Sequence, residues 1–103
     1  MQVPKWKLRR NNELYQILDL KLDNFTVSKT ILNPGKQTLG HSHPHEEVYI
    51  FTSGAGSILI GSTVSPVSPG DILHILGNEF HRVSNPDKRK PLIFTCVFKE
   101  GKE

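Results

Sequence analysis

The stretch PGKQTLGHSHPHEEVYIFTSGAG, residues 34–56, combines a dense group of titratable side chains with the pattern of a β-strand. Three of the five histidines in this 103-residue chain and two glutamates lie within residues 41–47. An apolar run, residues 48–51, follows at once, and glycines and a proline bracket the whole stretch. What such a cluster does depends on the fold that presents it.

The rest of the chain predicts an all-β fold. Short segments rich in Val, Ile, Thr, Phe and Tyr alternate with Gly, Pro, Asn and Ser, and no segment keeps helical periodicity over about ten residues. The predicted strands are residues 14–18, 25–32, 38–43, 47–52, 56–60, 72–75, 81–85 and 92–99, with breaks at 33–35, 53–56, 65–71 and 85–91. Short strands at this spacing are typical of a single-domain sandwich or barrel.

Strand geometry brings the polar cluster together. Because side chains alternate between the two faces of a strand, His41 and His43 share one face of the predicted strand 38–43. Pro44 lacks an amide donor and is expected to end that strand. Two imidazoles on one strand, with the carboxylate of Glu47 on the next, can converge on one point. That is the geometry of a metal site.

Imidazole nitrogens and carboxylate oxygens suit divalent Fe, Mn, Co, Ni and Zn. A half-buried Glu47 is costly unless it is paired, and a cation held between it and two neutral histidines would supply that partner. The alternative is that residues 41–47 form an exposed polar loop in which the cluster is accidental. A further neutral donor in the right place favours the metal site, and His81 is that candidate.

With His81 included, the chain resembles the cupin superfamily. The first cupin motif, G-x5-H-x-H-x3-E-x6-G, is met at every interval by Gly35, His41, His43, Glu47 and Gly54. The second motif, G-x5-P-x-G-x2-H-x3-N, is met at Gly70, His81 and Asn85, whereas Leu76 and Asn78 stand in place of its proline and second glycine. Asparagine tolerates the left-handed backbone, so the second departure is mild.

The resemblance implies a small single-domain cupin β-barrel (a double-stranded β-helix, or jelly roll) over residues 25–103, preceded by an N-terminal segment, residues 1–24. It implies one divalent transition-metal ion (Fe, Mn, Ni, Co or Zn) bound by His41, His43, Glu47 and His81. It also implies a homodimer, in which the N-terminal segment is either exchanged between subunits or forms an ordinary edge strand.

An open set of metal ligands admits a small-molecule ligand with vicinal oxygens, such as a hydroxy-ketone, a keto acid or a catechol. We expect a metal-dependent isomerase or lyase acting on a small sugar or keto acid. The alternatives are an Fe(II)-dependent dioxygenase and a non-catalytic small-molecule binding or sensing module.

Two further side chains are candidates for catalysis. Tyr49 shares a strand face with Glu47, and His74 lies on a strand that leads towards His81. For each of them the alternative is a structural role inside the barrel. His45 has the wrong register for the motif and is expected at the rim of the site. Asn85 is expected to hydrogen-bond a neighbouring turn.

Composition argues against other functions. The formal net charge is +3, with basic residues concentrated in residues 5–10 and 87–90. Neither group combines the aromatics or the reading helix of a nucleic-acid surface, so nucleic-acid binding is not expected. No apolar run approaches the roughly 20 residues that cross a bilayer, and the first residues do not read as a secretory signal. Cys96 is the single cysteine, which excludes an internal disulfide and fits a cytoplasmic location.

Overall fold

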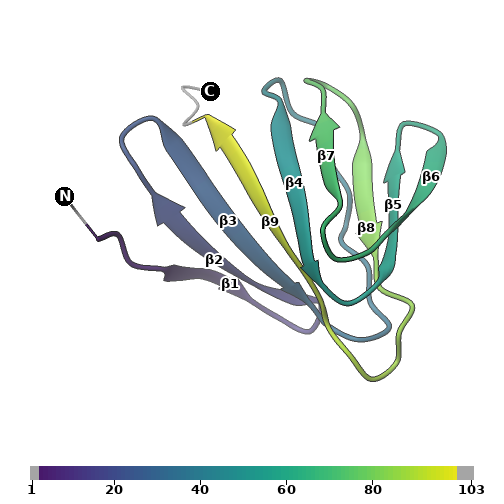
Figure 1. Cartoon of the computed structure of the whole chain (residues 1–103). Coiled ribbons are helices and arrows are strands. Elements are labelled where there is room, and N and C mark those ends of the chain that lie inside the picture. The colour runs from purple at the N-terminus through teal and green to yellow at the C-terminus, as the bar shows by residue number, and fades with distance from the viewer. Residues whose placement is uncertain (1–2, 100–103) are drawn as a thin grey trace.

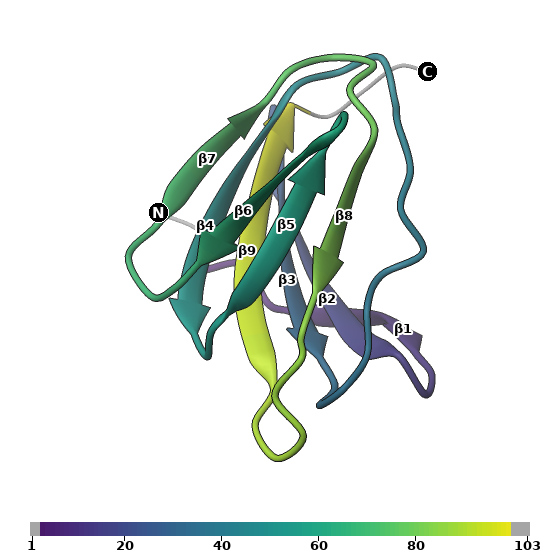
Figure 2. The same cartoon turned by 90° about the vertical axis from the view of Figure 1, so that its right-hand side faces the viewer.

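The computed structural model describes residues 3–99, and this part of the chain is all-β (Figure 1). Its strands are β1 (Lys7–Asn11), β2 (Tyr15–Lys21), β3 (Phe25–Leu32), β4 (Glu47–Ser53), β5 (Gly56–Ile60), β6 (Thr63–Val67), β7 (Ile72–Ile75), β8 (His81–Ser84) and β9 (Leu92–Lys99). They form a six-stranded sheet of order β1-β2-β3-β9-β4-β7 and a three-stranded sheet of order β6-β5-β8. The smaller sheet lies across one face of the larger sheet (Figure 2). Within residues 3–99 the two sheets do not join into one closed ladder.

The facing surfaces of the two sheets enclose the apolar core. Leu32, Phe51 and Leu92 from the large sheet are completely buried, as is Ile58 from the small sheet. Each such side chain contributes roughly 1.5–3 kcal/mol of burial free energy. On β9 the sequence allowed either face to point inwards, and the structure turns Leu92, Phe94 and Cys96 towards the interior.

The inner face of β3 is polar. Its buried residues Thr26, Ser28 and Thr30 alternate with partly exposed neighbours. They pair with Phe98, Cys96 and Phe94 of β9 in that order. One end of the interior is therefore lined by small polar groups as well as aromatic rings.

The predicted strand 38–43 is wrong as a continuous strand. Only single bridges form in this region, from Gln37 to Ser84 and from His41 to His81 of β8. The physical reason is Gly40, whose φ of +85° lies in the left-handed region and cannot continue a strand. A Cβ at Gly40 would also lie 2.5 Å from the ring of Phe80. The segment therefore crosses β8 with interrupted backbone pairing.

β6 was not anticipated, and β1 was anticipated only through the edge-strand alternative for the N-terminal segment. β1 pairs with β2, which itself pairs with β3 of the same chain, so the N-terminal segment forms the edge of the large sheet. β6 occupies part of the predicted break 65–71 although it contains Pro66. Proline is tolerated there because β6 is the edge strand of its sheet.

The two features expected of the second motif are present. Asn78 has a φ of +67°, so asparagine does take the left-handed conformation at the glycine position. Asn85 is almost fully buried, and its Nδ2 group donates to the carbonyl oxygens of Leu32, Asn33 and Lys90 at 2.9–3.2 Å. Its side chain thus joins the end of β3 to the turn before β9.

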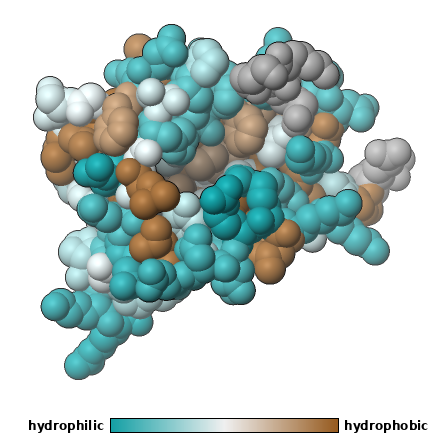
Figure 3. All heavy atoms as spheres, turned by 180° about the vertical axis from the view of Figure 1, so that it is seen from behind, coloured by the Kyte–Doolittle hydropathy of each residue, from teal (hydrophilic) through white to brown (hydrophobic). Residues whose placement is uncertain are grey.

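The face of the molecule opposite to Figure 1 is mainly hydrophilic, with hydrophobic side chains in several separate groups (Figure 3). The described part of the chain has no helix of the length and apolarity needed to cross a membrane.

Candidate metal centre

Four side chains, two from the loop before β4 and one each from β4 and β8, converge at one end of the interior. One potential ligand atom from each of His41, His43, Glu47 and His81 lies within 4.8 Å of the others. His41 and His81 are brought together by their backbones, since each amide donates to the other residue's carbonyl at 3.0–3.1 Å. Glu47 and His81 begin β4 and β8 respectively. The structure therefore groups the four residues that the motif spacing singles out.

Hydrogen bonding to the backbone fixes how two of these imidazoles face the cluster. Nδ1 of His43 lies 2.9 Å from the carbonyl oxygen of His45, and Nδ1 of His81 lies 2.9 Å from that of Glu79. A carbonyl oxygen only accepts, so each Nδ1 carries a proton and donates it. The neutral form of each ring consequently turns an unprotonated Nε2 towards Glu47.

In this arrangement, hydrogen-bond acceptor atoms of Glu47, His43 and His81 face one another. Oε1 of Glu47 lies 3.0 Å from Nε2 of His43 and 3.5 Å from Nε2 of His81. His81 is 2% exposed, and its Nε2 has no hydrogen-bond partner. A carboxylate facing two unprotonated imidazole nitrogens requires a cation between them, either protons or a metal ion. The donor set thus fits a divalent transition metal.

Burial and mutual charge shift the pKa of each group. Burial, together with neighbouring His81 and His43, lowers the pKa of His41 and favours its neutral, ligating form. Burial alone would raise the pKa of Glu47, but His81 and His43 outweigh it and the pKa is lowered. Burial likewise opposes a charge on His81, yet Glu47 and the carbonyl of Glu79 raise its pKa.

Tyr49 lies directly beside the cluster. It is 5% exposed, and its ring is 5.6 Å from that of His81, edge to face, and 5.4 Å from that of Phe94. Burial, with smaller contributions from Cys96 and Glu47, strongly raises the pKa of its phenol. Tyr49 therefore stays protonated at neutral pH, and its hydroxyl can donate a hydrogen bond.

Cys96 pairs with Tyr49 on the neighbouring strand and is buried. Burial raises the pKa of its thiol well above the usual value, and Glu47 adds to the shift. The thiol is therefore not a nucleophile, and Cys96 acts as a small buried hydrophobic side chain.

A cavity of about 460 Å³ opens next to the cluster, a volume typical of small-molecule sites. His41, His43, Glu47 and Tyr49 line one part of it. The remaining lining is partly apolar and partly hydroxyl-bearing, with Tyr15, Ile17, Ser28, Thr30, Thr38, Leu39, Phe94 and Phe98 among its residues. A small polar molecule can therefore reach the candidate ligands from the cavity.

The other histidines occupy different places. His45 stacks on His43 with ring centroids 4.0 Å apart, stacks on Phe98, and also lines the cavity, which matches the expected rim position. His74 pairs with Val48 across the sheet and so lies on the face opposite to Glu47. Its side chain is 54% exposed and lies 3.4 Å from Glu46. The structure does not bring His74 into the candidate site.

Sequence reasoning missed two cavity residues, Arg9 and Arg10, which both line it. The alternation of side chains along a strand could not have predicted both, because consecutive residues of a regular strand face opposite ways. The only available signal was the basic character of residues 5–10.

Comparison with known proteins supports this description of the fold. The family model described as "Cupin domain" matches residues 28–98. A search of curated proteins finds no match.

Several solved structures share the architecture. An RmlC-like cupin from Shewanella frigidimarina NCIMB 400 is 15% identical with a TM-score of 0.81, covering 96% of this chain and 87% of that one. A predicted oxalate decarboxylase from Thermotoga maritima is 18% identical with a TM-score of 0.82, covering 95% and 98%. The polyketide cyclase RemF from Streptomyces resistomycificus is 18% identical with a TM-score of 0.75, covering 84% and 66%. At these identities the likeness shows the fold alone.

Proposed function

The chain belongs to the cupin family, and from this premise we propose that it is a metal-dependent isomerase or lyase acting on a small sugar or keto acid. His41, His43, Glu47 and His81 would hold one divalent ion of Fe, Mn, Ni, Co or Zn. Such an ion supplies Lewis acidity, which lowers the pKa of a C–H or O–H group beside a chelating oxygen.

The observation that carries the metal site is the unpartnered Nε2 of His81. A polar atom buried without a hydrogen bond costs about 1–3 kcal/mol, so it is retained only where something compensates for it. Its Nδ1–H is already used by the carbonyl of Glu79, and the nearest carboxylate oxygen, on Glu47, is also an acceptor. A proton on this Nε2 would pair it with Glu47 alone, whereas a metal ion can bind all four converging ligand atoms at once.

The cavity favours isomerase or lyase chemistry over the other two classes. It is lined by basic side chains able to hold an anionic substrate and by Tyr49, whose neutral phenol can donate a hydrogen bond to a ligand oxygen. We propose that Tyr49 stabilises, through this hydrogen bond, the substrate oxygen on which negative charge develops. His74 lies on the opposite face of the sheet and has no part in this mechanism.

An Fe(II)-dependent dioxygenase is the second candidate, and one observation favours it. Phe94 and Phe98 give the cavity an aromatic wall, which suits an apolar substrate beside bound oxygen. The two classes differ in whether turnover consumes O₂, and oxygen-electrode traces with the same substrates separate them. Binding without either reaction would identify a non-catalytic small-molecule module.

The proposed reaction is tested by proton exchange. We expect the metal-loaded protein to incorporate deuterium from D₂O beside the carbonyl of one or more 2-oxo acids or small ketoses, as detected by mass spectrometry. Tyr49→Phe should slow this exchange about 100-fold without changing the metal content, since it removes the hydrogen-bond donor to the substrate oxygen but none of the four ligands.

His74→Ala is the matched control for Tyr49→Phe and should exchange at the wild-type rate. If wild-type protein exchanges no faster than His81→Ala on every substrate offered, the isomerase or lyase assignment is wrong.

We further propose that the protein is a cytoplasmic homodimer. Support comes from the apolar side chains of Trp6, Leu8, Leu22 and Phe25, which are 42–57% exposed at or near the edge formed by β1. Light scattering coupled to gel filtration should give a dimer mass that falls towards the monomer on dilution. A monomer mass at every concentration would contradict the dimer.

A further inference from the structure

A β-bulge sends two consecutive arginines into the same cavity. In the β1–β2 ladder, Leu8 pairs with Leu18 and Arg10 pairs with Ile17, so Arg9 is the inserted residue. A bulge of this kind re-aims side chains that would otherwise alternate. Arg9 and Arg10 accordingly both line the cavity that also holds His41, His43 and Glu47.

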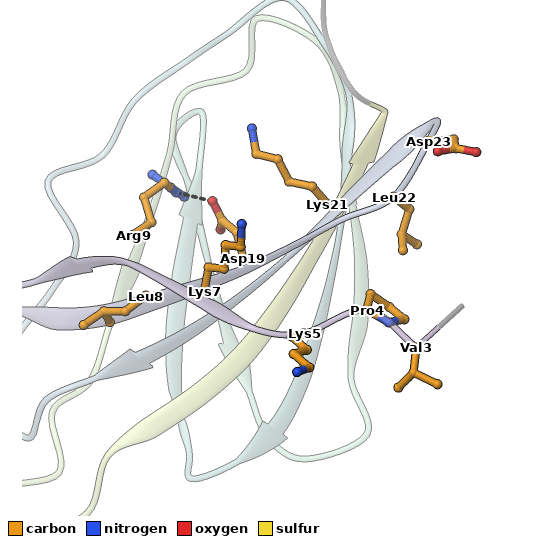
Figure 4. Close-up of a pocket in the computed structure, with 10 residues that line it drawn as sticks. All are labelled: Val3, Pro4, Lys5, Lys7, Leu8, Arg9, Asp19, Lys21, Leu22 and Asp23. Carbon is orange, nitrogen blue, oxygen red and sulfur yellow. Dashed lines mark hydrogen bonds and ion pairs between the residues drawn. The ribbon is translucent and has the colours of Figure 1, made fainter. Parts of the chain in front are cut away.

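Arg9 is held in place by a buried polar network. Its Nε donates to Oδ2 of Asp19 at 2.5 Å, and its Nη2 donates to Oγ of Ser28 at 3.3 Å. The Ser28 hydroxyl in turn donates to Oδ1 of Asp19, and both residues are at least nine-tenths buried. Figure 4 shows Arg9 and Asp19 turned towards one another, at the edge of a neighbouring hollow that both residues also line.

Arg9 therefore has an evident structural role, but this role does not occupy all of its hydrogen-bond donors. A guanidinium group carries five N–H donors in a fixed planar fork, and the network with Asp19 and Ser28 takes up two of them. The Asp19 carboxylate balances the charge of Arg9. The side chain is still 45% exposed, so its other donors remain accessible.

Arg10 has no such structural explanation. Within residues 3–99 its side chain makes no ion pair or hydrogen bond. It shares the inner face of the sheet with Ile17 and lines the cavity with it. It therefore contributes an uncompensated positive charge beside a polar wall formed by Ser28 and Thr30.

We propose that Arg9 and Arg10 bind a second anionic group of the ligand, a carboxylate or a phosphate, while the ligand's vicinal oxygens lie at the His/Glu cluster. The inference rests on the proposed function and narrows its substrate to a molecule with two separated acidic or chelating ends. Planar guanidinium groups bind carboxylates and phosphates in two-point contacts, and a cavity of about 460 Å³ accommodates a ligand of this size.

The test compares ligands that differ only in the second anionic group. The probes are 2-oxoglutarate against 2-oxopentanoate, and 3-phosphoglycerate against glycerate, titrated calorimetrically into the Mn(II)-loaded protein. Wild type should bind the more highly charged member of at least one pair at least tenfold more tightly. The pair that shows this preference identifies the group as carboxylate or phosphate.

Arg10→Gln should weaken binding of the more highly charged member of the pair about tenfold. It should leave the affinity for the less charged member unchanged, because only the second anionic group contacts the guanidinium. Lys7→Gln is the matched control, since it removes one positive charge from the same strand at a residue that does not line this cavity. Arg9→Lys keeps the charge beside Asp19 and should weaken the charged probe through loss of the planar fork.

The inference is overturned if the wild-type protein does not bind the more highly charged member more tightly in either pair. It is also overturned if Arg10→Gln and Lys7→Gln weaken binding of that member equally. Metal analysis of each variant separates this failure from failure of the proposed function. If metal is present but the preference is absent, the anion site alone is wrong. If no metal binds, the same titrations with succinate and inorganic phosphate decide the anion site independently, and an Arg10-dependent affinity supports it.

Discussion

Replacement of His81 by alanine is expected to remove most of the bound metal. His81 presents an Nε2 atom that is buried and without a hydrogen-bond partner, and its ring is oriented by the carbonyl of Glu79. Loss of the partner that orients a ligand already costs 10–100-fold in metal affinity, so loss of the ligand itself should cost more than about 100-fold. Metal content per chain after gel filtration, measured by plasma mass spectrometry, gives the result.

His45→Ala is the control for this substitution. His45 also stacks on His43 and lines the cavity, but it lies outside the group of four converging ligand atoms. Its removal should leave the metal content unchanged. Because His81 is completely enclosed, His41→Ala serves as a second test at an exposed ligand, where loss of folding is not expected. Equal metal contents in the His45 variant and the two ligand variants would refute the ligand assignment.

Replacement of Asn85 by alanine is expected to lower the free energy of unfolding by about 3 kcal/mol. The Asn85 amide donates to three carbonyl oxygens, on Leu32, Asn33 and Lys90, and its Oδ1 accepts from the amide of Asp87. The Asn33 carbonyl would keep the amide of Lys36, but alanine would remove the Asn85 donor from the carbonyls of Leu32 and Lys90 in a site that is 2% exposed, at about 1–3 kcal/mol for each group that water cannot reach. Urea denaturation followed by circular dichroism measures the change.

Ser84→Ala provides the neighbouring control for the Asn85 variant. The Ser84 hydroxyl donates to Oε1 of Gln37 in an exposed position, so its loss should change the free energy of unfolding by no more than about 0.5 kcal/mol. Similar destabilisation by the two substitutions would mean that Asn85 does not tie β3 to the turn before β9.

Much of this fold was predictable because alternation and motif spacing are local properties. The buried positions of β4, including Glu47 and Tyr49, follow the two-residue period of a strand packed on one face. The spacing of the two motifs identified His81 as the partner of His41 although forty residues separate them, and the structure pairs their backbones directly.

The features that were not predicted depend on backbone irregularities, which the alternation of side chains along a strand does not reveal. Gly40 interrupts the strand expected before His41, and the bulge at Arg9 turns two consecutive arginines to the same side. For His74 the strand β7 is regular, and its pairing with Val48 places this histidine on the face opposite to Glu47. No pattern in the sequence predicts a one-residue bulge, and none determines which face of an isolated strand is buried.

The central claim is that His41, His43, Glu47 and His81 bind one metal ion, and elemental analysis of the untagged protein tests it most directly. Protein purified without chelators, in parallel with and without oxygen, should contain about one divalent transition metal per chain. The same protein stripped with a chelator should take up one equivalent of Fe, Mn, Co, Ni or Zn again. If no metal is found in either preparation, and none binds when each is offered, the four side chains are not a metal site and the chemistry proposed for the cavity is wrong.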